Sequence, residues 1–140
     1  MASEAEFAAF VQGIAAEQLS DTFWRCEFPV TADPSGPQRE VYIEITAVRR
    51  VIKVVQVMTK LITARLDTTP VLLRDDGTVI MAGFGYVPGE ADRGVVLMKT
   101  ILPLLALHIG DGQDLINFLV AFAMEGDAID RAHGQTLYMR

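Results

Sequence analysis

The chain has 140 residues, 51% hydrophobic and 8% aromatic, which excludes a disordered segment and suits one folded domain over residues 1–140. Its 12 basic and 18 acidic residues give a net charge of −6 at pH 7. This sign disfavours nucleic acid and anionic membranes as partners, because binding to either depends on clustered lysine and arginine.

The first segment has the signature of an amphipathic helix. Ser3 and Glu6 have the spacing of a capping box, in which the two residues satisfy backbone amides at a helix start. Apolar side chains follow at helical spacing, namely Phe7, Phe10, Val11, Ile14, Ala15 and Leu19. We therefore expect a helix from Glu4 to about Leu19.

Two strands are expected next. Apolar and polar side chains alternate from Trp24 to Val30 and again from Val41 to Ala47, which is the period of a strand with one buried face. The segment between them, Thr31 to Arg39, collects Pro, Gly, Asp and Ser and is typical of an exposed turn. The two strands should therefore pair antiparallel.

Residues 49–66 carry two conflicting signals. They are rich in β-branched side chains, which favour strands. Their polar positions recur every three or four residues, as on one stripe of a helix, at Arg49, Lys53, Gln56, Lys60 and Thr63. We interpret the periodicity as the stronger signal and expect a helix, although its start, within residues 49–57, could instead extend the preceding strand.

The second half predicts a hairpin and then helices. The Asp-Gly pair at 76–77 supplies a left-handed turn within a hairpin over residues 71–87. Helices are expected from about Ala91 to Ile109, kinked at Pro103, and from about Asp114 to Ala132. The predicted fold class is therefore α+β, an antiparallel meander of about four to five strands with helices packed on one face, in the order α-β-β-α-β-β-α-α.

No residue cluster predicts a catalytic, cofactor-binding or metal site. Neither His108 nor His133 has a second histidine or a cysteine at metal-ligand spacing. Cys26, the only cysteine, has no histidine beside it to activate the thiol. The acidic residues of 125–130 are typical of a solvated helix face, and the glycines of 83–85 lack the spacing of a phosphate loop. We therefore expect no catalysis, no cofactor and no metal.

The apolar run over residues 95–124 is the most unusual feature. A membrane-spanning helix needs about 20 consecutive apolar residues, and neither half of the run reaches that length, so no membrane span is expected. The last helix is apolar all round, because only Asn117 interrupts residues 115–124. This predicts an interface with another protein chain, although the two final helices could also bury each other and the sheet.

Several elements form a recognisable pattern: the opening helix, "FWRCEFPV" and "EVYIEITAV" as a strand pair, a helix through "VVQVMTKLITARL", the hairpin "VLLRDDGTVIMAGFGYVPG" and the final helices. In this pattern the chain resembles the bacterial type III secretion chaperone-like superfamily, including its YbjN-type sensory-transduction regulators. The small size of the chain and its pI near 4.8 are also similar to those of secretion chaperones. The resemblance implies an α+β fold that dimerises and binds an extended segment of a partner protein, without catalysis.

We therefore expect a non-enzymatic, chaperone-like or regulatory homodimer that binds a client protein segment. The lack of a cationic and apolar leader in "MASEAEFAAF" predicts a cytoplasmic location. The predicted client contacts on the sheet are Trp24, Phe28, Tyr42, Phe84 and Tyr86. The predicted dimer-interface residues are Leu115, Phe118, Leu119 and Phe122. The alternative is a small-molecule sensor with an apolar pocket between the helices and the sheet.

Overall fold

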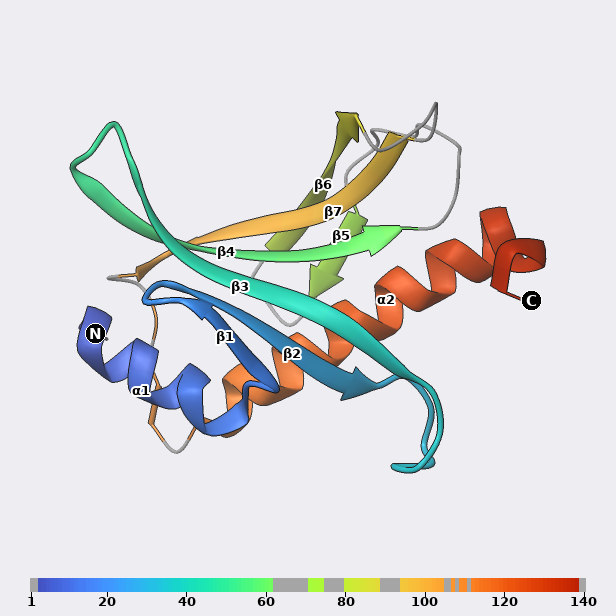
Figure 1. Cartoon of the computed structure of the whole chain (residues 1–140), viewed down its shortest axis with the longest axis horizontal. Coiled ribbons are helices and arrows are strands. Elements are labelled where there is room, and N and C mark those ends of the chain that lie inside the picture. The colour runs from blue at the N-terminus through green and yellow to red at the C-terminus, as the bar shows by residue number, and fades with distance from the viewer. Residues whose placement is uncertain are drawn as a thin grey trace.

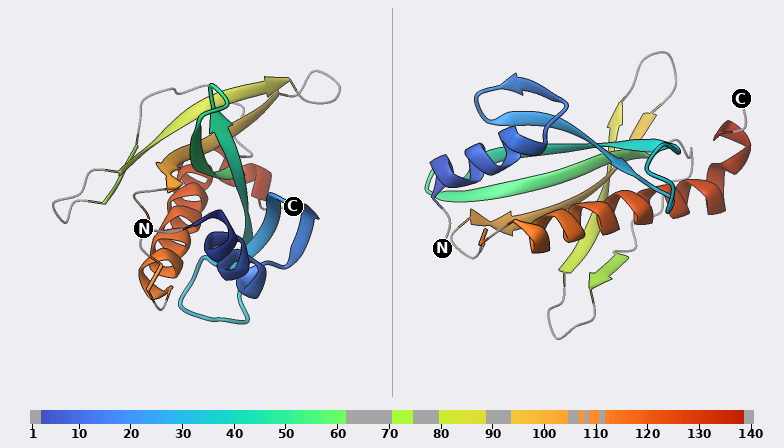
Figure 2. Two further views of the ribbon diagram at one scale, coloured as in Figure 1. Left: turned by 90° about the vertical axis from the view of Figure 1, so that its left-hand side faces the viewer. Right: turned by 90° about the horizontal axis from the view of Figure 1, so that it is seen from below.

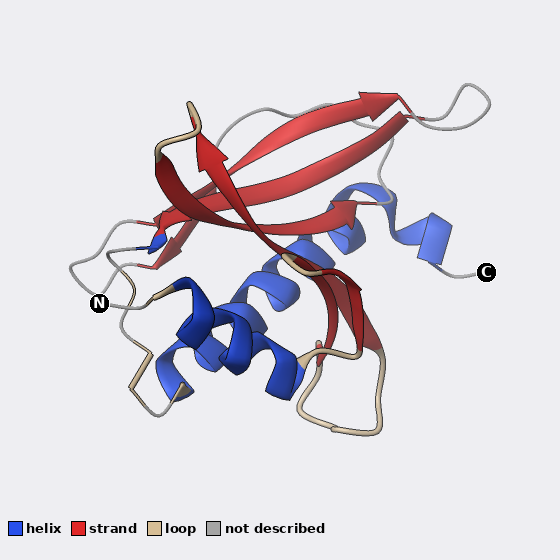
Figure 3. Ribbon diagram, turned by 60° about the vertical axis from the view of Figure 1, so that its left-hand side comes forward, coloured by secondary structure: helices blue, strands red, loops and turns tan. Residues whose placement is uncertain are grey.

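The computed structural model describes residues 3–61, 71–74, 80–88, 94–104, 107, 109–110 and 112–138, with side chains for 3–61, 98–104, 107, 109–110 and 112–131. Within these residues, helices cover one face of a twisted antiparallel sheet (Figure 3). The predicted α+β class is therefore confirmed. The predicted order of elements is confirmed only in part, because strands replace the end of the first predicted helix and two of the later ones.

The first helix, α1, spans Glu4–Ile14. The Ser3 side chain accepts a hydrogen bond of 3.1 Å from a first-turn amide, as the capping box predicts. The helix ends before the predicted Leu19, because the backbone becomes extended at Ala15. The residues that follow form a short strand, β1, Glu17–Ser20.

The predicted strand pair is confirmed as β2, Phe23–Pro29, and β3, Gln38–Val48, which pair antiparallel. Their register places Trp24 opposite Ile43. Strand β1 pairs with the other edge of β2. Buried and less buried side chains alternate along β2 and β3, which is the pattern of a sheet covered by helices on one face.

Residues Ile52–Leu61 form strand β4, so the helix predicted over 49–66 is wrong there. Strand β4 pairs with β3 on one side and with β7, Gly94–Pro103, on the other. A central strand is hydrogen-bonded along both edges, and β-branched side chains pack well on its pleated surface. The β-branched content was therefore the better guide than the spacing of the polar residues.

Strands β5, Val71–Arg74, and β6, Ile80–Pro88, pair antiparallel and confirm the predicted hairpin. Its turn at 76–77 lies outside the described residues. Strand β6 also pairs with β7, which replaces most of the helix predicted from Ala91 to Ile109. The segment of β7 reads as a nearly continuous apolar run, which periodicity does not distinguish from a buried helix.

The complete sheet has the order β1-β2-β3-β4-β7-β6-β5. After β4 the chain passes to the far edge as β5, and β6 and β7 return toward the centre. The sheet twists so strongly that β5 and β6 cross the direction of β2 and β3 (Figures 1 and 2).

The last predicted helix is confirmed as α2, Gln113–Tyr138, which runs along the covered side of the sheet (Figure 1). It begins after Gly112, whose φ is +83° and whose missing Cβ leaves room for the Phe10 ring. The core lies between the sheet and the two helices, and Trp24 and Phe122 are fully buried in it. The apolar side of α2 is thus covered by the chain's own sheet.

Candidate functional site

The two faces of the sheet have different environments. Ile43, Val57 and Leu102 lie on the face that α1 and α2 cover, and the side chains between them in each strand point the other way. No described helix covers this second surface, here termed the outer face (Figure 3). Its described side chains are Phe23, Arg25 and Glu27 of β2, Glu40, Tyr42, Glu44, Thr46 and Val48 of β3, Ile52, Val54, Gln56, Met58 and Lys60 of β4, and Lys99, Ile101 and Pro103 of β7.

The β3–β4 hairpin carries the most exposed aliphatic side chains of the outer face. Val48 and Ile52 lie opposite each other and are 44% and 56% exposed, and Val51 in the turn is 79% exposed. The half-exposed Ile101 of β7 lies further toward the centre of the same face, opposite Gln56, whereas Val54 between them is buried. Val48, Val51, Ile52 and Ile101 are termed the hairpin end.

Two arginines form the tip of the hairpin. Arg49 and Arg50 have φ values of +52° and +64°, a left-handed conformation that is uncommon for residues other than glycine, asparagine and aspartate. The Val51 amide donates to the Val48 carbonyl at 3.1 Å and closes the turn. Both arginines are exposed, and neither forms an ion pair within the described part of the chain. The tip therefore adds two uncompensated positive charges to the exposed aliphatic side chains.

An aromatic cluster, Phe23, Tyr42 and Met58, lies nearer the centre of the outer face. The Phe23 and Tyr42 ring centroids are 5.9 Å apart, and Met58 lies opposite Tyr42 in the register. Lys60 Nζ lies 5.5 Å from the Tyr42 centroid, in cation–π range. The Tyr42 hydroxyl donates to Glu40 Oε2 at 2.9 Å. Burial, and then this hydrogen bond, raise the pKa of Tyr42 above its ordinary value.

A charged network borders the aromatic cluster. Arg25 lies 3.1 Å from Glu17, 2.9 Å from Glu27 and 3.7 Å from Glu40. Hydrogen bonds to Glu27 and then to Glu17 raise the pKa of Arg25. Exposed ion pairs of this kind contribute little to stability. Their structural effect is to fix the charged side chains of β1, β2 and β3 beside the aromatic cluster.

A buried ion pair on the covered face was not predicted. The Arg39 guanidinium donates to Asp130 Oδ2 through Nη2, and through Nη1 to Thr59 Oγ1 at 3.2 Å and to the Lys60 carbonyl at 2.7 Å. Asp130 is fully buried, so the prediction that the acids of 125–130 form a solvated face is wrong for this residue. The pair ties α2 to β3 and β4.

Two signals in the sequence could have revealed this pair. Arg39 lies four positions before Ile43 in β3, and an even spacing places both side chains on the covered face. Gly126 lies one helical turn before Asp130, and a Cβ there would lie 2.9 Å from the Thr59 side chain. A charged residue at a position of a strand that otherwise points apolar side chains to the core indicates a buried ion pair. A glycine and an acidic residue one turn apart on a helix indicate that the helix approaches the sheet closely and supplies the partner.

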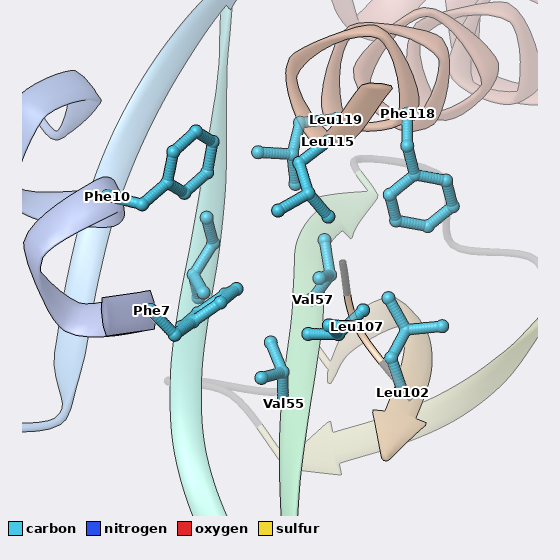
Figure 4. A pocket seen from close by; sticks show the side chains of 10 residues that line it. Phe7, Phe10, Val55, Val57, Leu102, Leu107, Leu115, Phe118 and Leu119 are labelled. Carbon is cyan, nitrogen blue, oxygen red and sulfur yellow. The ribbon is translucent and has the colours of Figure 1, made fainter. Parts of the chain in front are cut away.

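A small apolar hollow lies where α1, α2 and the sheet meet (Figure 4). Its volume is about 10 Å³, room for about one water molecule at most. Its lining residues are Phe7, Phe10, Ile43, Val55, Val57, Leu102, Leu107, Leu115, Phe118 and Leu119. Ligand pockets commonly enclose about 300–1,000 Å³ and carry a few polar groups that orient the ligand. The hollow is therefore smaller and less polar than a typical ligand site.

The predicted client contacts are divided between the two faces. Trp24 and Phe28 are buried on the covered face, which removes them from the accessible surface of the fold. Tyr42 lies on the outer face in the aromatic cluster. Phe84 and Tyr86 belong to β6, and their side chains lie outside the described residues.

The predicted dimer-interface residues pack inside the chain. Phe118, Leu119 and Phe122 are buried in the core, and Leu115 lines the hollow. The physical reason is that β4 and β7 are strands, which gives α2 a larger sheet to pack against than the predicted fold contained. The apolar character of α2 therefore does not require a second chain.

The described residues show no assembled reactive centre. Burial raises the pKa of the Cys26 thiol to about 11, so the thiol is neutral at pH 7 and a poor nucleophile. His108 and the side chain of His133 lie outside the described residues. Within the described part, no three His, Cys, Asp or Glu side chains are grouped so that they could hold a metal ion.

Comparisons with known proteins give no match. No family model, no curated protein and no solved structure matches the chain. In the described part of the chain, no helix has both the length and the apolar character to cross a membrane. The outer face, with its hairpin end and aromatic cluster, is therefore the feature on which a functional proposal rests.

Proposed function

We propose that the chain is a non-enzymatic, chaperone-like or regulatory module that works as a homodimer and binds an extended segment of a client protein on the outer face. This role agrees with the resemblance to the type III secretion chaperone-like superfamily, and we propose a cytoplasmic location with it. One observation carries the proposal: the aromatic cluster lies on a face of the sheet that no described helix covers.

The aromatic cluster has the composition of a protein-binding surface. Aromatic residues and methionine are enriched at protein interfaces, since they offer large contact areas. Phe23, Tyr42 and Met58 come from three adjacent strands, which hold the side chains in place before a client arrives. The charged network around Arg25 forms a polar rim that orients a client while contributing little affinity.

The outer face is a better docking surface than the free edge at β1. Strand addition requires a regular run of unpaired backbone amides and carbonyls. Strand β1 has four residues, and its register shifts between Gln18 and Ser20, so it presents only a short and irregular edge. We therefore propose that the client lies across the strands, in contact with the aromatic cluster.

A peptide library displayed on phage tests the proposal without a known client. Peptides selected on the wild-type protein should bind Met58→Asp at least about tenfold more weakly, because a carboxylate then occupies the centre of an apolar contact. Met124→Asp is the matched control, since Met124 is exposed on α2, away from the outer face. This control should bind the selected peptides as the wild type does.

Two outcomes would count against the proposal. If no peptide is enriched over several rounds of selection, the proposed binding function is wrong. Selected peptides that bind Met58→Asp and the wild type equally would place the binding surface elsewhere. Circular dichroism of both variants establishes that they are folded before the comparison is made.

The apolar hollow supports a second candidate, a small-molecule sensor. Both helices and the sheet contribute to its lining, so an apolar ligand there would contact α1 and α2 at once (Figure 4). Native mass spectrometry of freshly purified protein tests this candidate. A stoichiometric co-purifying molecule is the result it predicts, and a protein mass with nothing bound would contradict it.

A further inference from the structure

We propose that the hairpin end is the contact surface between two copies of this chain, with Arg49 and Arg50 of one copy paired with Glu44 of the other. This inference rests on the proposed function only in that the chain works as a pair. It assigns the dimer contact to the outer face rather than to α2, whose apolar residues are already buried.

Exposed apolar side chains gather at the hairpin end. Of the six exposed large hydrophobic residues in the described part of the chain, four belong to it: Val48, Val51, Ile52 and Ile101. Val48 and Ile52 lie opposite each other with Val51 in the turn between them, and Ile101 lies on the same face of β7, opposite Gln56. Single exposed apolar residues are ordinary, whereas a contiguous cluster usually marks an interface.

The charges on this part of the outer face complement one another across two copies. Arg49 and Arg50 have no ion-pair partner among the described residues, and the half-buried Glu44 has none there either. By contrast, Arg25 and Lys53 are paired within the chain. A second copy that presents the same groups in reverse order would satisfy all three charges.

The order of residues along the hairpin permits such a twofold arrangement. From the tip inward, the outer face presents the two arginines, then Val48 opposite Ile52, then Thr46 opposite the buried Val54, then Glu44. Glu44 lies roughly 13 Å along the strand from Val48 at the usual rise per residue. With a twofold axis just inward of Val48 and Ile52, these two exposed side chains of each copy lie near the axis, and the arginines of each copy reach Glu44 of the other.

A second copy fits this surface better than a membrane or a nucleic acid. Two arginines are too few to hold an anionic bilayer or a phosphate backbone against a net charge of −6. The surface from the tip to Glu44 comes from one hairpin and part of β7, fewer residues than the roughly 20–30 per partner of a standard stable interface. The dimer should therefore be reversible and dependent on concentration.

Sedimentation velocity over a wide concentration range tests the inference. The average mass of the wild-type protein should rise from monomer toward dimer, and added salt should reverse the rise. Arg49→Glu/Arg50→Glu and Glu44→Arg should each remain monomeric, because like charges then face each other at both ends of the contact. An equal mixture of these two variants should form a heterodimer, because opposite charges again face each other.

Two further variants serve as controls. Lys99→Glu changes a charge on the outer face beyond the hairpin end and should leave self-association unchanged. Glu44→Gln keeps the side-chain shape and should weaken association roughly tenfold. Its smaller perturbation keeps the test valid if Glu44→Arg does not fold.

Three results would overturn the inference: a wild-type protein that is monomeric at every concentration, single variants that dimerise like the wild type, or a variant mixture without heterodimer. Binding of a monomeric wild type to phosphatidylserine vesicles, lost in Arg49→Glu/Arg50→Glu, would make the tip a membrane contact instead. Peptide binding is measured separately through Met58→Asp, so a failed dimer contact and a failed client surface are distinguishable.

Discussion

The two faces of this sheet come from the same strands but differ in their side chains. On the covered face, alternate residues of β2, β3 and β4 are mostly apolar and buried beneath α1 and α2. The buried charge there, Arg39, is held by Asp130. On the outer face, aromatic, aliphatic and charged side chains lie together, and no helix among the described residues covers them. The covered face stabilises the fold, and the outer face is the surface on which the proposed partners would bind without rearranging the core.

Because the two faces differ, whether a strand residue has an odd or even position tells which face its side chain lies on. Successive side chains of a strand point to opposite faces, so residues that are neighbours in the sequence lie on different faces of the sheet and have different roles. Val57 is buried beneath the helices, whereas Met58, the next residue, belongs to the aromatic cluster. Substitutions in β3 and β4 should therefore separate into two classes, one that affects stability and one that affects binding.

The largest effect is expected in the core of the covered face. Phe122→Ala removes a fully buried ring and should lower the free energy of unfolding by about 3–5 kcal/mol, because the cavity is only partly refilled. Met124→Ala, on the exposed side of the same helix, should change it by less than about 0.5 kcal/mol. Urea denaturation measures both values. Equal losses would contradict the distinction between the two sides of α2.

A slightly smaller effect is expected at the buried ion pair. Asp130→Ala leaves the Arg39 guanidinium buried without its carboxylate and should cost about 3 kcal/mol of stability. Asp127→Ala breaks the pair with the exposed Arg131 and should cost less than about 1 kcal/mol. Adding Arg39→Met to Asp130→Ala should recover part of the loss in the same denaturation assay. A double variant whose loss of stability equals or exceeds the sum of the losses in Asp130→Ala and Arg39→Met would contradict the coupling.

Burial on the covered face also predicts an alkaline sensitivity. The Cys26 thiol has a pKa of about 11 in the fold against an ordinary value of 9.0, so between these pH values the unfolded chain loses a proton that the folded chain keeps. Stability should be unaffected by this group below about pH 9 and should fall as the pH rises toward 11. Cys26→Ala should flatten this part of the pH–stability curve, and an unchanged slope would contradict the burial of the thiol.

The smallest effect is expected at the hairpin tip and has the opposite sign. Arg49→Asn with Arg50→Gly should raise the free energy of unfolding by about 1 kcal/mol, since asparagine and glycine adopt positive φ readily. The same variant should weaken self-association. Arg49→Lys/Arg50→Lys is the control, because it keeps both charges and should preserve the dimer. Thermal melting and sedimentation report the two effects, and a loss of stability in the Asn-Gly variant would contradict the left-handed turn.

The sequence predicted elements that carry a local signal better than the two strands at the centre of the sheet. The Ser3 cap, the alternation in β2 and β3, the β5–β6 hairpin and the final helix each carry a local signal, and all were found. Strands β4 and β7 were mistaken for helices, because their side chains alternate less cleanly than those of β2 and β3, although all four strands are paired on both edges. In β4, Val54 and Val55 are both buried, which obscures the period of two.

The candidate site was less predictable for the same reason. Tyr42 lies on the outer face, whereas Trp24 and Phe28, predicted for the same client surface, lie buried on the opposite face. With β4 expected as a helix, Met58 had no position beside Tyr42. Register between strands decides which side chains meet, and no local sequence pattern encodes it.

The central claim, that the outer face binds a client, is tested most directly by comparing two methionines in one sample. Met58 lies on the outer face, and Met124 is exposed on α2. Hydroxyl-radical footprinting with a selected peptide should show oxidation of Met58 falling several-fold on binding while that of Met124 stays unchanged. Unchanged oxidation of Met58 in the complex, or protection of Met124 alone, would contradict the account.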